Sequence, residues 1–225
     1  MTMISATRNY IVLTETSWGW SRLQQTFCRD AKLKIAFNSR EWVDLSNIYT
    51  ISFYGKGGDG RVVLALNCRD SCLAIVKIFD PPDADKNASQ EHNLWRTLWN
   101  VDTCLRTVAG SPALIMPFVI AADSNGKFAL TPEEWICHHS NLTDAIVDGF
   151  ESLNDITKQI TKCYNEGGHT FEKTAEEAQR RIHECSLKHA DIKNEHVALL
   201  PWFDRNGVLN RLEPILIDLS RVSEL

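Results

Sequence analysis

A group of glycines and the lysine that follows it are the first residues of this chain whose types and spacing could do chemistry. The group consists of Gly55, Gly57, Gly58 and Gly60, with Val62 two positions beyond its last member. Glycines let a backbone approach phosphate oxygens without side chains in the way. Lys77 ends an apolar run 17 residues after Gly60 and would bring a positive charge to the same anion. Together they predict a nucleotide-binding clamp, whereas the glycines alone fit an ordinary hairpin turn equally well.

Further charged residues along the chain form a pattern that suits phosphoryl transfer. They are Glu91 in an expected helix, the pair Asp191 and Lys193 after a later helix, and Asp218 at the end of an apolar stretch. Phosphoryl transfer needs in-line positioning of the reactants and cations against spreading negative charge, rather than covalent help. Lysines supply part of that positive charge. One carboxylate can hold a metal ion while another orients the attacking hydroxyl.

The elements expected to hold these residues form a β-rich half followed by an α-rich half. Strands are expected over residues 33–37, 47–54, 61–67, 72–79 and 113–119. Helices are expected over residues 88–100, with Ser89 as N-cap, and over residues 145–160 and 172–186. A late hairpin is expected to pair residues 197–200 with residues 214–217. This order is typical of two lobes with a cleft between them.

Composition narrows the classes of protein to consider. The chain has 225 residues, a net charge of −5 and a pI of about 5.8, which argues against a protein built mainly to coat nucleic acid. Its seven cysteines are an odd number and form no C-x-x-C pair, which favours free thiols in a reducing compartment. We find neither a secretory signal nor a long apolar run. We therefore expect an intracellular protein, cytoplasmic or nuclear, without a nucleic-acid or membrane partner.

The order of these motifs over residues 46–222 resembles that of the protein-kinase-like superfamily. The resemblance implies an α+β, protein-kinase-like two-lobe fold. A β-rich N-lobe with one regulatory-type helix would precede a minimal helical C-lobe. The implied boundaries are residues 1–45 for an N-terminal extension, residues 46–120 for the N-lobe and residues 121–225 for the C-lobe.

The resemblance also implies a role for each polar residue. The glycine loop would cover the phosphates of ATP, and Lys77 would hold the α- and β-phosphates while pairing with Glu91. Asp191 would accept the proton of the acceptor hydroxyl, and Lys193 would neutralise the transferred phosphoryl group. Asp218 would bind Mg²⁺. The implied activity is ATP- and Mg²⁺-dependent transfer to a protein or small-molecule hydroxyl.

The chain departs from the superfamily pattern at several positions. Five residues after Asp191 stands His196 instead of a metal-binding asparagine, and Mg²⁺ prefers oxygen ligands to imidazole. Asp218-Leu219-Ser220 lacks the usual hinge glycine, and Ala190 replaces an arginine. Only seven residues follow Asp218, so we expect a truncated C-lobe. The ending is similar to that of small fungal kinase-like proteins and Crinkler-type effector kinases.

Other interpretations of the same residues stay open at this point. A pseudokinase would keep the nucleotide cleft but act as a nucleotide-binding or protein-interaction module, and His196 favours this alternative. An interaction domain unrelated to kinases would carry the motifs by accident. The pattern at Glu91 is compatible with an exposed helix position as well as with a partner in an ion pair. The position of His189 favours a structural residue that braces its loop over an acid or a base.

Overall fold

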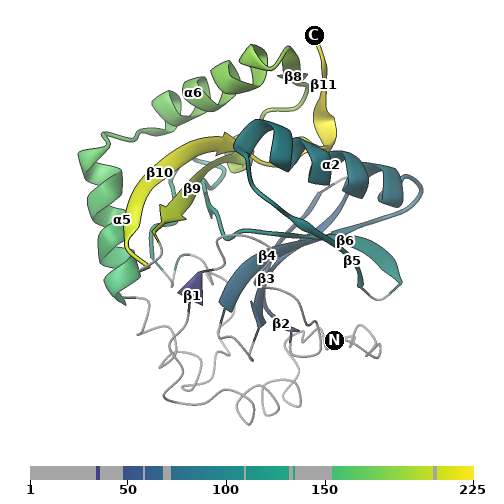
Figure 1. Cartoon of the computed structure of the whole chain (residues 1–225), viewed down its shortest axis with the longest axis horizontal. Coiled ribbons are helices and arrows are strands. Elements are labelled where there is room, and N and C mark those ends of the chain that lie inside the picture. The colour runs from purple at the N-terminus through teal and green to yellow at the C-terminus, as the bar shows by residue number, and fades with distance from the viewer. Residues whose placement is uncertain are drawn as a thin grey trace.

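The computed structural model describes residues 34–35, 48–57, 59–67, 72–108, 110–131, 134, 154–204 and 207–225. Within these residues the chain is α+β: one large sheet carries a helix on one face, and two further helices pack on a smaller sheet (Figure 1). Gly58, and the part of the expected helix over residues 145–160 that precedes residue 154, lie outside the described residues.

Six strands form the large sheet in the part of the chain that is described. They are β1 (Lys34–Ile35), β2 (Ile48–Gly57), β3 (Gly60–Asn67), β4 (Cys72–Phe79), β5 (Cys104–Val108) and β6 (Ser111–Met116). Their order is β2-β3-β4-β6-β5, with antiparallel neighbours, while β1 pairs with β4 in parallel. The expected strand over residues 113–119 ends earlier, at Met116, because Pro117 has no N–H to donate to a ladder. The sequence pattern does not predict β5.

Helix α2 (Ala84–Trp99) lies across one face of the large sheet (Figure 1). The expectation that Ser89 caps this helix is wrong, because the helix begins at Ala84 and Ser89 lies inside it. Burial of Ala84 against the core explains the earlier start, since a helix is stabilised mainly by packing of its apolar face. The helix ends where Asn100 adopts the left-handed conformation and its N–H bonds to the Arg96 carbonyl.

The second part of the chain combines helices with short sheets. Its elements are β7 (Ile120–Ala121), α5 (Asn154–Glu166), α6 (Phe171–Glu184), β8 (Leu187–His189), β9 (Val197–Phe203), β10 (Leu209–Leu216) and β11 (Val222–Glu224). Thr170 caps α6 by accepting a hydrogen bond from the Lys173 N–H. Strands β9 and β10 form the expected late hairpin, which β7 extends, and β8 pairs with β11. Helices α5 and α6 run along β10 (Figure 1).

One hydrophobic core runs through both parts of the molecule. The same cluster contains Phe79 of β4, Trp95 of α2, Ile182 of α6 and Leu216 of β10. A second cluster, formed by Val63, Val76, Ile78 and neighbours, lies on the opposite face of the large sheet. Because strand residues alternate between faces, β4 contributes to both clusters. The large sheet, α2 and the β9–β10 hairpin therefore share one packed interior.

Replacing Trp95 tests the importance of the contact between α2 and this core. Trp95 is fully buried, so Trp95→Ala should lower the free energy of unfolding by about 3–5 kcal/mol. Thr97→Ala, on the exposed side of the same helix, should change it by less than about 0.5 kcal/mol. Denaturant unfolding, followed by far-ultraviolet circular dichroism, gives the free energy of unfolding of both variants. Equal effects of the two substitutions would contradict the packing described here.

Candidate functional site

Three charged side chains from distant parts of the sequence meet at one point, and we call them the Lys77 cluster: Lys77 of β4, Glu91 of α2 and Asp218 after β10. The ammonium Nζ of Lys77 lies 2.7 Å from Oε2 of Glu91 and donates a second hydrogen bond to Oδ1 of Asp218. Lys77 and Glu91 are 4% and 1% exposed. The interpretation of Glu91 as an exposed helix residue is therefore wrong, and the expected pairing with Lys77 is present.

Two local periodicities bring these residues together. Along β4, the side chains of Ile75, Lys77 and Phe79 point to the face that α2 covers, while the alternate residues point to the other face. Along α2, Glu91 lies on the same buried stripe as Ala88 and Trp95. The strand alternation and the helical stripe thus place a cation and an anion opposite each other inside the core.

Lys77 and Asp218 hold each other in their charged forms. Burial alone would lower the pKa of the Lys77 ammonium, but Glu91 and Asp218 outweigh this effect and raise that pKa. Burial raises the pKa of the Glu91 carboxyl, and the charge of Lys77 only partly offsets the rise. Burial also acts to raise the pKa of Asp218, but Lys77 outweighs it and holds that pKa below its usual range. Lys77 and Asp218 are therefore both charged at neutral pH.

His189 braces the loop that carries Asp191 against the segment that carries Asp218. Its Nδ1 accepts a hydrogen bond from the Asp191 N–H at 3.3 Å. Its Nε2–H therefore faces the carbonyl oxygens of Ile217 and Asp218, at 3.2 and 3.1 Å. Burial lowers the pKa of His189, which favours this neutral form. The structural interpretation of His189 is confirmed.

Asp191, Lys193 and His196 lie next to this brace. The carboxylate of Asp191 has its Oδ2 3.0 Å from Nζ of Lys193, and this hydrogen bond lowers the pKa of Asp191. His196 uses Nδ1 to bond the Asp191 carbonyl oxygen at 2.7 Å, and its Nε2 lies 3.6 Å from Oδ2 of Asp218. The two residues proposed from the sequence as metal ligands, Asp218 and His196, therefore face each other.

The glycines lie in the β2–β3 hairpin. Gly57 pairs with Gly60, and Gly55 pairs with Val62, which in turn lies opposite Lys77 on β4. A Cβ atom at Gly60 would come within 2.1 Å of the Ile78 carbonyl oxygen, so this position requires glycine for the approach of β3 to β4. Gly60 therefore has a structural reason to be glycine, independent of any phosphate.

A second polar contact, which the sequence reasoning missed, joins this hairpin to the end of the chain. We call it the hairpin clasp: Asp59, Ser220 and Arg221. The Ser220 hydroxyl donates to Oδ2 of Asp59 at 2.7 Å, and Arg221 lies 3.3 Å from Oδ1 of the same carboxylate. Ser220 Oγ is also 3.3 Å from Oδ1 of Asp218. The sequence offered one sign of this contact, because Ser220 stands where the superfamily pattern has a glycine. Only the fold shows what the Ser220 hydroxyl contacts.

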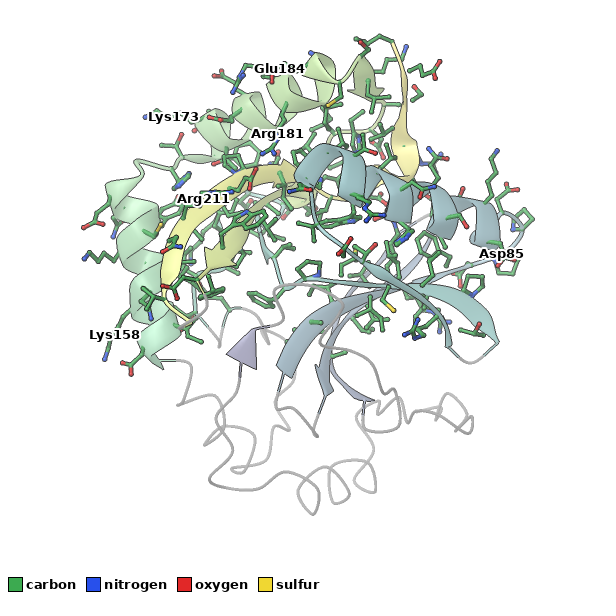
Figure 2. All side chains as sticks on the ribbon, viewed as in Figure 1. Asp85, Lys158, Lys173, Arg181, Glu184 and Arg211 are labelled. Atoms are coloured by element: carbon green, nitrogen blue, oxygen red, sulfur yellow. The ribbon has the colours of Figure 1, made fainter. Side chains whose placement is uncertain are left out.

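Two concavities on the described surface lie away from the Lys77 cluster. One, of about 470 Å³, lies between the turn before α6, α6 itself and β10, and its lining includes Lys173, Arg181 and Arg211, which Figure 2 labels on that side of the molecule. Both arginines pair with Glu213. The other, of about 490 Å³, lies on α6. At the Lys77 cluster itself, ion pairs join β4, α2 and the segment after β10, and the hairpin clasp joins the β2–β3 hairpin to that segment.

Two properties of the described residues bear on ligands and membranes. Among these residues, no three histidine, cysteine, aspartate or glutamate side chains gather into a group suited to a metal ion. A bound cation at Asp218 and His196 would thus need further ligands from elsewhere, such as a nucleotide. None of the described helices has the length and apolar character needed to cross a bilayer.

Comparison with known proteins gives little beyond this geometry. A family model described as "Family of unknown function (DUF5898)" matches residues 53–132, which include the β2–β3 turn, Lys77 and Glu91. Asp191, His196 and Asp218 lie beyond the matched segment. A search of curated proteins finds no match.

A double-mutant cycle tests whether the Lys77 cluster is a buried ion pair. Lys77→Met leaves Glu91 buried without its partner and should lower the free energy of unfolding by about 3–5 kcal/mol. Glu91→Leu is the second single variant, and the double variant Lys77→Met/Glu91→Leu should lose less free energy of unfolding than the sum of the two single variants, because the buried ammonium and the buried glutamate are then both absent. Urea unfolding gives the values. Lys162→Met, which removes an exposed pair with Glu166, should cost less than about 1 kcal/mol. Additive losses in the double variant would refute the coupling.

The acid dependence of stability tests the charge of Asp218. Because its pKa is lower in the folded chain than the usual value of about 3.9, its contribution is complete above that value and disappears as the pH falls through the folded pKa. Asp218→Asn should therefore flatten the rise of the free energy of unfolding between about pH 2 and pH 5. Asp155→Asn, at an exposed site where the carboxylate pairs only with the exposed Lys158, should not flatten it. Identical pH profiles for wild type and Asp218→Asn would show that Asp218 is unperturbed.

Proposed function

We propose that this protein is an ATP- and Mg²⁺-dependent phosphotransferase with a protein-kinase-like two-lobe fold, acting on a protein or small-molecule hydroxyl. The observation that carries the proposal is the Lys77 cluster: one buried lysine contacts both the helix glutamate and the aspartate expected to bind metal. Asp191 and Lys193 lie on the loop that His189 ties to the same aspartate. Four separate elements thus supply the groups that phosphoryl transfer requires.

Lys77 is suited to hold a nucleotide phosphate. An ammonium group has three N–H donors, and the two carboxylates of the cluster take two of them. The third can be donated to a phosphate oxygen under the β2–β3 hairpin. Since Asp59 at the hairpin tip is itself an anion, entry of phosphates requires the hairpin clasp to open.

The donor set at Asp218 fits a divalent cation bound together with a nucleotide. Lys77 contacts Oδ1 of Asp218, while Oδ2 faces Nε2 of His196. Mg²⁺ is commonly held by one or two protein ligands and completes its shell with phosphate oxygens and water. When bound, the cation would neutralise charge on the phosphates.

Asp191 and Lys193 would act on the acceptor. The Asp191 carboxylate takes the proton of the acceptor hydroxyl while the hydroxyl oxygen forms a bond to the γ-phosphorus of ATP. The bond from that phosphorus to the β–γ bridging oxygen breaks, so ADP leaves with the electron pair. Lys193 lies 3.0 Å from Asp191 and can shift its ammonium to the transferred phosphoryl group. The products are ADP, a proton and the phosphorylated acceptor.

The second candidate function is a pseudokinase that binds nucleotide or a partner protein without transfer. Two observations favour it. Lys193 already pairs with Asp191, so its ammonium neutralises the carboxylate that would accept the proton. His196 stands where an oxygen ligand for the metal is expected. This candidate predicts nucleotide binding with no chemistry.

Replacement of Asp191 separates the two candidates. Asp191→Asn should lower transfer from ATP about 10²–10⁴-fold, because the proton acceptor is lost, while nucleotide binding persists. Transfer is measured with γ-labelled ATP and a panel of protein and small-molecule acceptors, and binding by thermal shift with ATP and Mg²⁺. Asp85→Asn on the exposed side of α2 is the matched control and should behave as wild type.

The outcomes are distinct. Binding by the wild-type protein without transfer to any acceptor would favour the pseudokinase. No thermal stabilisation at millimolar ATP would overturn the nucleotide site, and both candidates with it. Unchanged transfer in Asp191→Asn would remove Asp191 from the proposed mechanism.

A further inference from the structure

The hydrogen bond of His196 fixes which ring nitrogen faces Asp218. Nδ1 lies 2.7 Å from the carbonyl oxygen of Asp191, and a carbonyl can only accept a hydrogen bond. Nδ1 therefore carries the proton. In the neutral ring Nε2 then has a free lone pair, and this nitrogen lies 3.6 Å from Oδ2 of Asp218. The bond at Nδ1 thus turns Nε2, the ring nitrogen that can offer an electron pair to a cation, toward the carboxylate of Asp218.

Neither side chain can easily turn away from the other. The side chain of His196 is only 13% exposed, and its ring lies beside that of His189 with centroids 5.7 Å apart. Asp218 is held at its other oxygen by Lys77, and its backbone adopts the left-handed conformation with φ of 59°. Two facing lone pairs repel each other unless a proton or a cation lies between them.

The separation of the two donors is close to that of two ligands of one cation. Metal–ligand bonds of about 2.0–2.2 Å put adjacent ligands about 2.8–3.1 Å apart in octahedral geometry and about 3.3–3.6 Å apart in tetrahedral geometry. The observed 3.6 Å lies at the upper end of the tetrahedral range and about half an ångström beyond the octahedral one. Coordination of an octahedral cation by both residues therefore requires the imidazole and the carboxylate to approach each other by about half an ångström.

The nitrogen changes which cation the pair prefers. Mg²⁺ demands oxygen ligands, whereas first-row transition ions accept imidazole together with carboxylate and phosphate oxygens. We propose that His196 and Asp218 form a mixed nitrogen–oxygen site that selects a divalent transition cation, with Mn²⁺ as the probe, over Mg²⁺. The inference rests on the proposed nucleotide site, because phosphate oxygens must complete the coordination shell. It replaces Mg²⁺ as the preferred ion of that site.

The experiment measures cation binding directly in the presence of the β,γ-methylene analogue of ATP, which has no bridging nitrogen. Mn²⁺ affinity is followed by the electron paramagnetic resonance signal of free Mn²⁺, and Mg²⁺ affinity by competition. Pulsed resonance detects coupling of bound Mn²⁺ to an imidazole ¹⁴N. The wild-type protein should prefer Mn²⁺ and show this coupling.

His196→Asn supplies oxygen in place of nitrogen and should lower the ratio of Mn²⁺ to Mg²⁺ affinity at least about tenfold, with loss of the ¹⁴N coupling. His196→Gln is a second variant should the first not fold. His183→Asn, on the exposed side of α6, is the control and should keep both the ratio and the coupling.

Each outcome has one meaning. If the analogue binds but the wild-type protein prefers Mg²⁺, or if neither variant changes the ratio and the coupling, His196 does not ligate the cation and the inference is overturned, while the proposed function stands. If the analogue fails to bind with either cation, the nucleotide site itself is wrong and the inference falls with it. A lower ratio together with lost coupling in the variants supports it.

Discussion

The structure depends above all on the burial of one ammonium group. Lys77 lies inside the core, where an unpaired charge would be strongly destabilising, so its two carboxylate partners must be present at the same time. One partner comes from the helix on the sheet and the other from the segment after β10. The large sheet, α2 and the end of the chain are therefore held in one arrangement by a requirement of electrostatics as well as by apolar packing.

Apolar side chains from the same elements pack around this buried charge. Trp95 and Trp99 fill the space between α2 and the sheet, and Leu219, directly after the aspartate of the cluster, is fully buried in the same core. Gln90 adds a hydrogen bond from α2 to the Val222 carbonyl oxygen. The tryptophans thus join α2 to the large sheet, while Leu219 and the Gln90 hydrogen bond join the first half of the chain to its last residues, and together these contacts enclose the polar cluster.

Local periodicity explains which features could be predicted from the sequence. The alternation of β4 and the stripe of α2 are properties of neighbouring residues, so the strand and the helix could be predicted from the sequence pattern. The pairing of Lys77 with Glu91 was implied only by the resemblance to the protein-kinase-like superfamily, because the pattern fits an exposed glutamate equally well. The start of α2 at Ala84 depends on burial in the core, and β5 is an edge strand whose described residues are half-buried or exposed, so the hydrophobic pattern missed both. The role of Asp59 was equally hidden, since its partner Ser220 lies 161 positions away.

Ser220 has only one hydroxyl hydrogen, yet two carboxylates lie within its reach. Asp59 on the hairpin is at 2.7 Å and Asp218 at 3.3 Å, so with the hairpin down the hydrogen is directed to Asp59. Asp59 therefore takes the hydroxyl hydrogen, while Asp218 keeps the Lys77 ammonium as the donor to its Oδ1. One hydroxyl oxygen thus lies within reach of two like-charged carboxylates, and its single hydrogen stabilises the one that has no lysine partner among these contacts.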